Sequence, residues 1–140
     1  MAEFKNDQYG MGFDVVGSDF GGVSNPLLKR SWLHFVSECN LLMKNINESA
    51  SGHGFWDTHN ISEKLCLIHS EISEALEASR KDINAPDHHI PEFTNFTVEL
   101  ADTVIRALDL AYEYNLPIAE AIVAKHEYNK TRPHRHGKKF

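Results

Sequence analysis

The chain of 140 residues has little of what membrane, secreted or zinc-binding proteins need. Charged residues interrupt every apolar stretch, so none approaches the ~20 residues of a membrane-spanning helix. The first ten residues, MAEFKNDQYG, lack the basic and apolar regions of a secretory signal, so we expect a cytoplasmic protein with no membrane partner. The two cysteines, Cys39 and Cys66, have no CxxC spacing and are typical of reduced core thiols rather than of a disulfide or zinc site.

Basic residues are scarce outside the last part of the chain. Residues 125–140 hold six of the 14 Lys and Arg but only one of the 20 Asp and Glu. Residues 1–124 therefore contain 8 basic and 19 acidic residues, a balance of −11, against +5 for the tail. A nucleic-acid-binding protein needs a broad basic surface to replace the counterions of phosphates. The acidic body argues against a nucleic-acid partner, but a small anionic ligand fits if a cation mediates its binding.

Strand patterns are also missing, and helical periodicity takes their place. Apolar residues recur at three- and four-residue spacing in four segments, and Asn25 followed by Pro26 suits the start of the first helix. The segment between the first two helices, rich in glycine and small polar residues, predicts a loop. The pattern predicts an all-α four-helix bundle. The predicted helices cover about 26–46, 62–81, 93–115 and 118–130, with the loop at 47–60.

The bundle is expected to be one domain with an appendage at each end. Residues 1–25 hold five of the eight glycines and show no sustained helical period, which predicts an irregular N-terminal arm. Residues 26–140 then form the helical domain with its basic C-terminal tail.

The segment 93–115 is apolar on two stripes, separated by a narrow polar line. A helix that is apolar around most of its circumference is buried in its fold or in an oligomer. We therefore expect self-association, and we expect the acids of the polar line to be incompletely solvated. The line consists of Glu99, Asp102, Arg106, Asp109 and Glu113.

Two pairs of carboxylates stand on consecutive predicted helices. Glu71 and Glu74 are three residues apart on one helix, and Glu99 and Asp102 are three apart on the next, so each pair lies on adjacent turns. If the helices pack antiparallel, the four groups converge and repel unless protons or cations relieve them. Oxygen ligands suit Mg²⁺ or Mn²⁺, whereas zinc favours His or Cys and di-iron bundles use Glu-x-x-His pairs. One pair alone would suggest a solvated helix face; two pairs favour a metal site.

The pattern E71-x-x-E74, 24 intervening residues and E99-x-x-D102 resembles the signature of the MazG-like all-α nucleoside triphosphate pyrophosphohydrolases. The runs GFWDTHNISEKLCLIHSEISEALEASRK, VELADTVIRALDLA and KHEYNKTR, with HGKK close behind, extend the resemblance from Gly54 to Lys139. It implies that the four carboxylates bind Mg²⁺ and that the enzyme cleaves a nucleoside triphosphate between the α and β phosphates. The products are a nucleoside monophosphate and pyrophosphate. The resemblance also implies a homodimer or homotetramer with the site near an interface.

The resemblance assigns roles to further residues. Lys125, Asn129 and Arg132 match the K-x-x-x-N-x-x-R element that holds phosphate oxygens, a role suited to a point charge, an amide and a guanidinium fork. Trp56 would lie near the base, although an anchor in the core or an interface explains it equally well. Either Glu71 or Glu74 would orient or deprotonate the attacking water.

Several alternatives stay open. Arg106 suits either an ion pair with Asp102 one turn away or a contact with the ligand. A phosphohydrolase of the His/Asp metal type would need an adjacent His-Asp dyad, but the chain has Asp87-His88 in the reverse order. None of the nine histidines has convincing zinc spacing. A non-catalytic helical interaction module, with the acids as surface charge, is the remaining interpretation.

Overall fold

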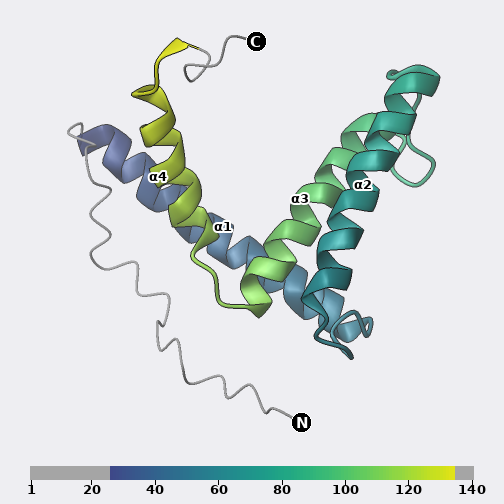
Figure 1. Cartoon of the computed structure of the whole chain (residues 1–140), viewed down its shortest axis with the longest axis horizontal. Coiled ribbons are helices and arrows are strands. Elements are labelled where there is room, and N and C mark those ends of the chain that lie inside the picture. Colours follow the sequence, from purple (N-terminus) through teal and green to yellow (C-terminus); the bar gives the residue numbers. More distant parts are fainter. Residues whose placement is uncertain (1–25, 135–140) are drawn as a thin grey trace. The chain divides into compact units, whose positions relative to one another are not determined.

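The computed structural model describes residues 26–134 and consists of four helices (Figure 1). Their order along the chain is α1 (Pro26–Gly52), α2 (Ile61–Asp82), α3 (Asn95–Glu113) and α4 (Ile118–Lys130). In this described part, extended pairing is limited to one isolated bridge between Pro86 and Thr94, so the predicted all-α class is confirmed. The predicted N-terminal arm, the predicted cap at Asn25 and the last six residues lie outside the described residues.

A helix that spans a lipid bilayer must be both long and apolar. Within residues 26–134, none combines the length and the apolar character needed to cross it.

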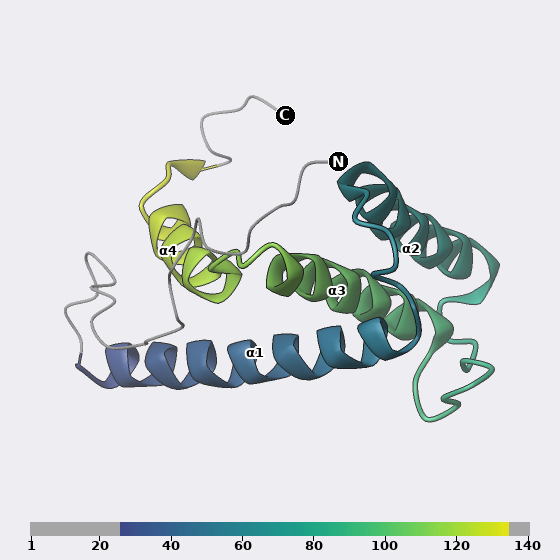
Figure 2. The ribbon, with the colours of Figure 1, turned by 90° about the horizontal axis from the view of Figure 1, so that it is seen from below.

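Helix α1 is longer than its periodicity predicts. It continues without interruption to Gly52 (Figure 2), so the predicted loop at 47–60 is wrong for its first six residues. The cause is Asn47, which is buried and whose Nδ2 donates to Asp109 Oδ1 at 2.9 Å and to Glu113 Oε2 at 3.2 Å. These contacts with α3 outweigh the weak helix propensity of the polar residues that follow.

The turn between α1 and α2 depends on two local devices. Gly54 has a φ of 81°, and a Cβ at this position would meet Asp57 Oδ2 at 3.0 Å, so glycine alone fits without strain. Asn60 then caps α2, because its Oδ1 accepts from the backbone N–H groups of Ser62 and Glu63 at 3.1 and 3.3 Å. Together they fix where α2 begins.

The described chain forms two compact units, and the first covers Met43–Tyr114. In it α2 and α3 lie side by side and run antiparallel (Figures 1 and 2). Three buried alanines on these helices allow the backbones to approach closely. The buried apolar residues of this unit are Met43, Trp56, Ala75, Ala78, Leu108, Leu110 and Ala111.

The second unit contains α1 up to Leu42 and the chain from Asn115 onward, including α4. Its core is formed by Val36, Cys39, Ala119 and Val123. Burial raises the pKa of the Cys39 thiol, which keeps it protonated and unreactive, as predicted for a core cysteine. Cys66 is exposed on α2, so the prediction of a core position is wrong for it; a helical period does not say which face meets the core.

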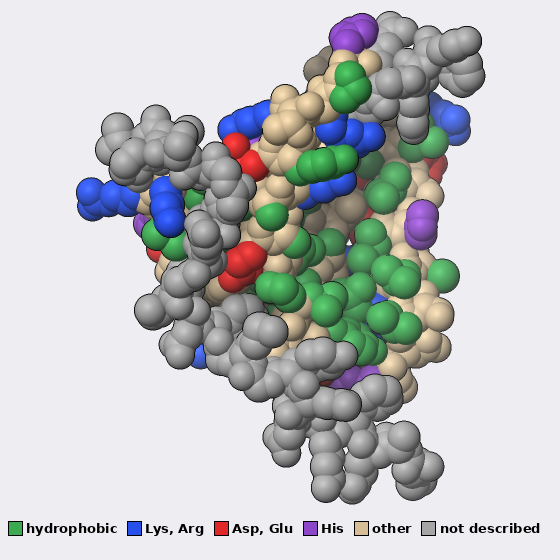
Figure 3. All heavy atoms as spheres, turned by 60° about the vertical axis from the view of Figure 1, so that its left-hand side comes forward, with side chains coloured by type: hydrophobic (Ala, Val, Ile, Leu, Met, Phe, Trp, Pro, Cys, Tyr) green, Lys and Arg blue, Asp and Glu red, His purple; other side chains and the backbone are tan. Residues whose placement is uncertain are grey.

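Helices α2 and α3 also carry large apolar side chains that the single chain leaves exposed. Leu65, Ile72 and Leu76 on α2 are each about half exposed, and they recur at seven- and four-residue spacing on one face. On α3, Leu100 and Val104 are exposed one turn apart. Figure 3 shows hydrophobic side chains gathered over a broad area of the molecular surface. The apolar character of α3 therefore exceeds what one chain buries.

Candidate metal centre

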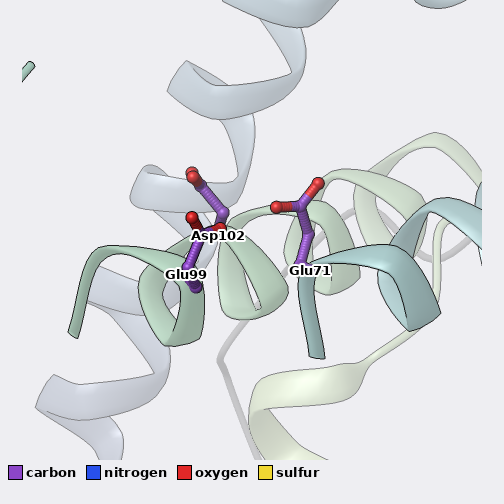
Figure 4. Close-up of side chains that lie close together, drawn as sticks. All are labelled: Glu71, Glu99 and Asp102. Carbon is purple, nitrogen blue, oxygen red and sulfur yellow. The ribbon is translucent and has the colours of Figure 1, made fainter. Parts of the chain in front are cut away.

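Three of the four predicted carboxylates converge in the structure. Glu71 on α2 and Glu99 and Asp102 on α3 each place a carboxylate oxygen within 4.8 Å of the other two (Figure 4). The spacing of Glu99 and Asp102 puts them on neighbouring turns, and the antiparallel packing of α2 brings Glu71 beside them. Glu71 is buried, and the other two are partly buried. We call these three residues the acid cluster.

Glu74, the fourth predicted carboxylate, lies one turn further along α2 with an exposed side chain. It places no oxygen within the 4.8 Å group. Its negative charge is nevertheless close enough to raise the pKa of Glu99. Glu74 therefore borders the acid cluster without belonging to it.

The acid cluster is electrostatically strained. Burial, followed by the charges of Glu74, Glu71 and Asp102, raises the pKa of Glu99 above its usual range. Burial and the charge of Glu71 likewise raise the pKa of Asp102, against the opposing effect of Arg106. Each shift means that the ionised form is costly in this environment. Protons or a bound cation would relieve that cost.

The donor set of the acid cluster fits a metal ion. Its members are carboxylates from two rigid helices, and no histidine or cysteine belongs to this group. Carboxylate oxygens are the ligands preferred by hard divalent cations. The acid cluster can therefore hold a cation.

Arg106 contacts the acid cluster in a way that its sequence position did not reveal. Its Nε donates to Glu71 Oε1 at 2.5 Å, which joins α3 to α2. The guanidinium carbon also lies 6.0 Å from the ring centroid of Phe55. The sequence suggested Asp102 or a ligand as the partner, because Glu71 is 35 positions away and its proximity depends on helix packing.

Trp56 is held as an anchor in the same unit. It is buried, and its Nε1 donates to both oxygens of Asp109, at 2.9 and 3.1 Å. The ammonium group of Lys64 lies 4.9 Å from the indole centroid. A small hollow beside the indole is bordered by aromatic, basic and apolar side chains, and Arg106 connects it to the acid cluster. Its lining residues are Phe55, Trp56, Lys64, Leu67, Arg106, Asp109 and Leu110.

The predicted phosphate-binding residues are in the second unit, around Tyr128. Lys125 Nζ lies 4.8 Å from the Tyr128 ring centroid, and the guanidinium carbon of Arg132 lies 5.8 Å from it. Asn129 is exposed next to Tyr128 on the last turns of α4. Lys125, Asn129 and Arg132 therefore share one face, which has an exposed aromatic ring at its centre. Sequence reasoning missed Tyr128, although its spacing of three and four residues from the two basic residues marks the same helix face.

Asp87, considered as part of a His/Asp dyad, has a local structural role. It is buried, and its Oδ1 accepts from the backbone N–H groups of His89 and Ile90, at 2.8 Å each. Both hydrogen bonds lower the pKa of Asp87. The bond from Ile90 has the larger effect, and the bond from His89 follows. The carboxylate therefore stabilises the α2–α3 connection in its ionised form.

Comparisons of the chain with models of protein families, with curated proteins and with solved structures gave no match. The chemistry of the site must therefore follow from its own residues and from the motifs of the sequence.

Proposed function

We propose that the protein is a Mg²⁺-dependent hydrolase that converts a nucleoside or deoxynucleoside triphosphate and water into the monophosphate and pyrophosphate. The observation that carries this proposal is the convergence of Glu71, Glu99 and Asp102 oxygens within 4.8 Å, from two antiparallel helices. The resemblance of the paired E-x-x-E and E-x-x-D motifs to the MazG-like superfamily supplies the reaction.

The residues of the site have separate roles in this proposal. Glu71, Glu99 and Asp102 would hold Mg²⁺, or Mn²⁺ in its place, and Glu74 would complete the ligand set. A bound divalent ion would neutralise phosphate oxygens and acidify a coordinated water. Glu71 or Glu74 orients the attacking water and accepts its proton. Glu74 suits the acceptor role because its exposed side chain has no hydrogen-bond partner in the described part of the chain.

The substrate is held by its phosphates and its base. Lys125, Asn129 and Arg132 bind phosphate oxygens, since a Lys point charge, an amide and an Arg fork are complementary to them. Trp56 contacts the base only through the small part of its ring that stays exposed, because Asp109 already holds its nitrogen. These contacts favour triphosphates over monophosphates but scarcely distinguish one base from another.

Self-association belongs to the same proposal. The exposed stripe of Leu65, Ile72 and Leu76 on α2 lies in the unit that contains the acid cluster, and α3 adds its own exposed apolar residues. A second copy of the chain, in a homodimer or homotetramer, covers this surface with the same stripe of its own. The resemblance to the superfamily implies the same oligomers.

Release of pyrophosphate from a panel of NTPs and dNTPs with Mg²⁺ tests the function. Glu99→Gln and Asp102→Asn are expected to lower kcat/KM at least 100-fold, because each removes a charged ligand of the cation. Glu77→Gln is the matched control, since Glu77 is an exposed acid on α2 that pairs with Lys81. Full activity in both cluster variants would refute the site.

The same assay separates two other functions. Release of inorganic phosphate in place of pyrophosphate would indicate another metal-dependent phosphohydrolase. A non-catalytic interaction module is favoured by the exposed apolar residues of α2 and α3, and it predicts no turnover of any nucleotide.

A further inference from the structure

Arg106 occupies a distinctive position at the acid cluster. Its Nε donates to Glu71 Oε1 at 2.5 Å, and Glu71 is only 5% exposed. A buried carboxylate without a partner is costly, so this contact compensates the charge of Glu71 inside the helix pair. Glu71 therefore has a cationic partner within the chain itself.

The charges around the acid cluster are unequal. Glu71, Glu99 and Asp102 carry three negative charges when ionised, and Arg106 supplies one positive charge against them. This charge compensates part of the repulsion in the absence of a metal ion. It also repels any divalent cation that approaches the same carboxylates, and it engages one of the two oxygens of Glu71.

The side chain of Arg106 also has a second contact surface. Its guanidinium carbon lies 6.0 Å from the Phe55 centroid, on the wall of the hollow next to Trp56. Arginine stacks on aromatic faces while it keeps its charge. Phe55 is therefore a second neighbour of the guanidinium, beside Glu71.

The geometry points to Arg106 as a built-in counter-ion that competes with the metal ion for the acid cluster and so weakens metal binding. Arg106 is a positioning residue, since it acts through its contact with Glu71. This inference rests on the proposed function only in taking the acid cluster as the metal site. It adds that the charge of Arg106 stabilises the acid cluster without a metal ion. The same charge lowers the affinity of the acid cluster for metal.

Binding of Mn²⁺ to the full chain, measured by electron paramagnetic resonance at one fixed pH, tests the inference. We expect Arg106→Gln to bind Mn²⁺ roughly three- to tenfold more tightly than the wild type, because removal of one nearby charge ends the competition. Arg106→Lys keeps the charge and is expected to stay within about twofold of the wild type, on the same electrostatic grounds. Arg80→Gln is the matched control, since it removes an exposed arginine of α2 with the same change in net charge.

Thermal unfolding supplies the second measurement. In EDTA, Arg106→Gln is expected to unfold at a lower temperature than the wild type, and saturating Mn²⁺ is expected to raise its Tm by more than it raises that of the wild type. Unchanged or weaker Mn²⁺ binding by Arg106→Gln would overturn the competition and leave Arg106 as a support for Glu71.

The two proposals fail in different ways. A wild-type protein that binds no Mn²⁺ contradicts both the metal site and the inference. A protein that binds Mn²⁺ but hydrolyses no nucleotide contradicts the proposed function alone, and the affinities of the Arg106 variants still decide the inference.

Discussion

The indole nitrogen of Trp56 and the carboxylate of Asp109 join the turn before α2 to the polar line of α3, with Nε1 2.9 Å from Oδ1. Asn47 of α1 donates to the same oxygen at 2.9 Å. One carboxylate thus connects three segments that are distant in sequence. Since α3 also carries Glu99 and Asp102, this connection helps to set the position of the acid cluster.

Loss of the indole N–H is expected to destabilise the protein. Trp56→Phe keeps an aromatic ring but removes a hydrogen bond to a charged acceptor, which is worth about 2 kcal/mol. We expect a lower free energy of unfolding in urea. A double-mutant cycle with Asp109→Asn should show that the two losses are not additive. If Trp56→Phe instead keeps its stability and raises KM for nucleotides, contact with the base is its main role.

Neutralisation of Glu99 is expected to have opposite effects with and without metal. Its raised pKa means that the folded protein favours the protonated form, so this group's contribution to stability is lost as pH rises through that pKa. In EDTA at pH 8, Glu99→Gln should have a higher Tm than the wild type, and the difference should vanish in acid. With Mg²⁺, the variant should lose most of the metal-induced rise in Tm. A lower Tm in EDTA at pH 8 would contradict the repulsion within the acid cluster.

The residues of the acid cluster show which parts of the site a sequence can predict. Glu99 and Asp102 share a helix face because of local periodicity alone, and the short α2–α3 connection implies antiparallel packing. Glu71 follows from those two facts. The pairing of Glu71 with Arg106 depends on side-chain reach across the helix pair, which no spacing rule contains.

The same limit explains the errors at α1 and Cys66. The partners of Asn47 that extend α1 are 62 and 66 positions away, so local propensity favoured a loop there. Cys66 lies on α2, which has apolar residues on more than one face. Among these apolar residues, the single chain buries mainly the alanines. Periodicity located the helices, but packing decided which face of each is covered.

Asp87 is expected to stabilise the fold in a pH-dependent way. Its pKa is lowered by the N–H groups of Ile90 and His89, so its contribution is present above the pKa of the unfolded chain. That contribution is lost as pH falls through the lower pKa of the folded protein. Asp87→Asn should therefore have a lower Tm than the wild type at neutral pH, with the gap closing in acid. Glu92→Gln, an exposed acid in the same connection, serves as the control. A gap that persists unchanged in acid would exclude the charge as its cause.

A charge in the exposed stripe of α2 is expected to dissociate the proposed oligomer. Leu76 is 49% exposed in the single chain, and Leu76→Lys would place an ammonium group between two apolar surfaces. Sedimentation velocity should show a shift from dimer or tetramer to monomer at micromolar concentration. Leu41→Lys is the matched control on α1, where Leu41 is 55% exposed. An equal effect of both substitutions would place the interface elsewhere.

The basic face of α4 is expected to contribute binding rather than chemistry. Lys125 and Arg132 both lie against the exposed ring of Tyr128, which limits their freedom and holds two charges on one face. Lys125→Gln and Arg132→Gln should each raise KM for a nucleoside triphosphate about tenfold or more, since a hydrogen bond to a charged group is lost. The value of kcat should change little, because the contact is the same in substrate and transition state.

Two further variants test whether the position of these charges matters. Lys130→Gln removes a neighbouring charge that already pairs with Glu127 at 2.7 Å, so its KM should stay near that of the wild type. Tyr128→Ala keeps both basic residues but removes the ring between them, and it should raise KM by less than the loss of either charge. If Lys130→Gln raises KM as much as Lys125→Gln does, the tail attracts nucleotides only through its net charge. The K-x-x-x-N-x-x-R spacing would then have no role in phosphate recognition.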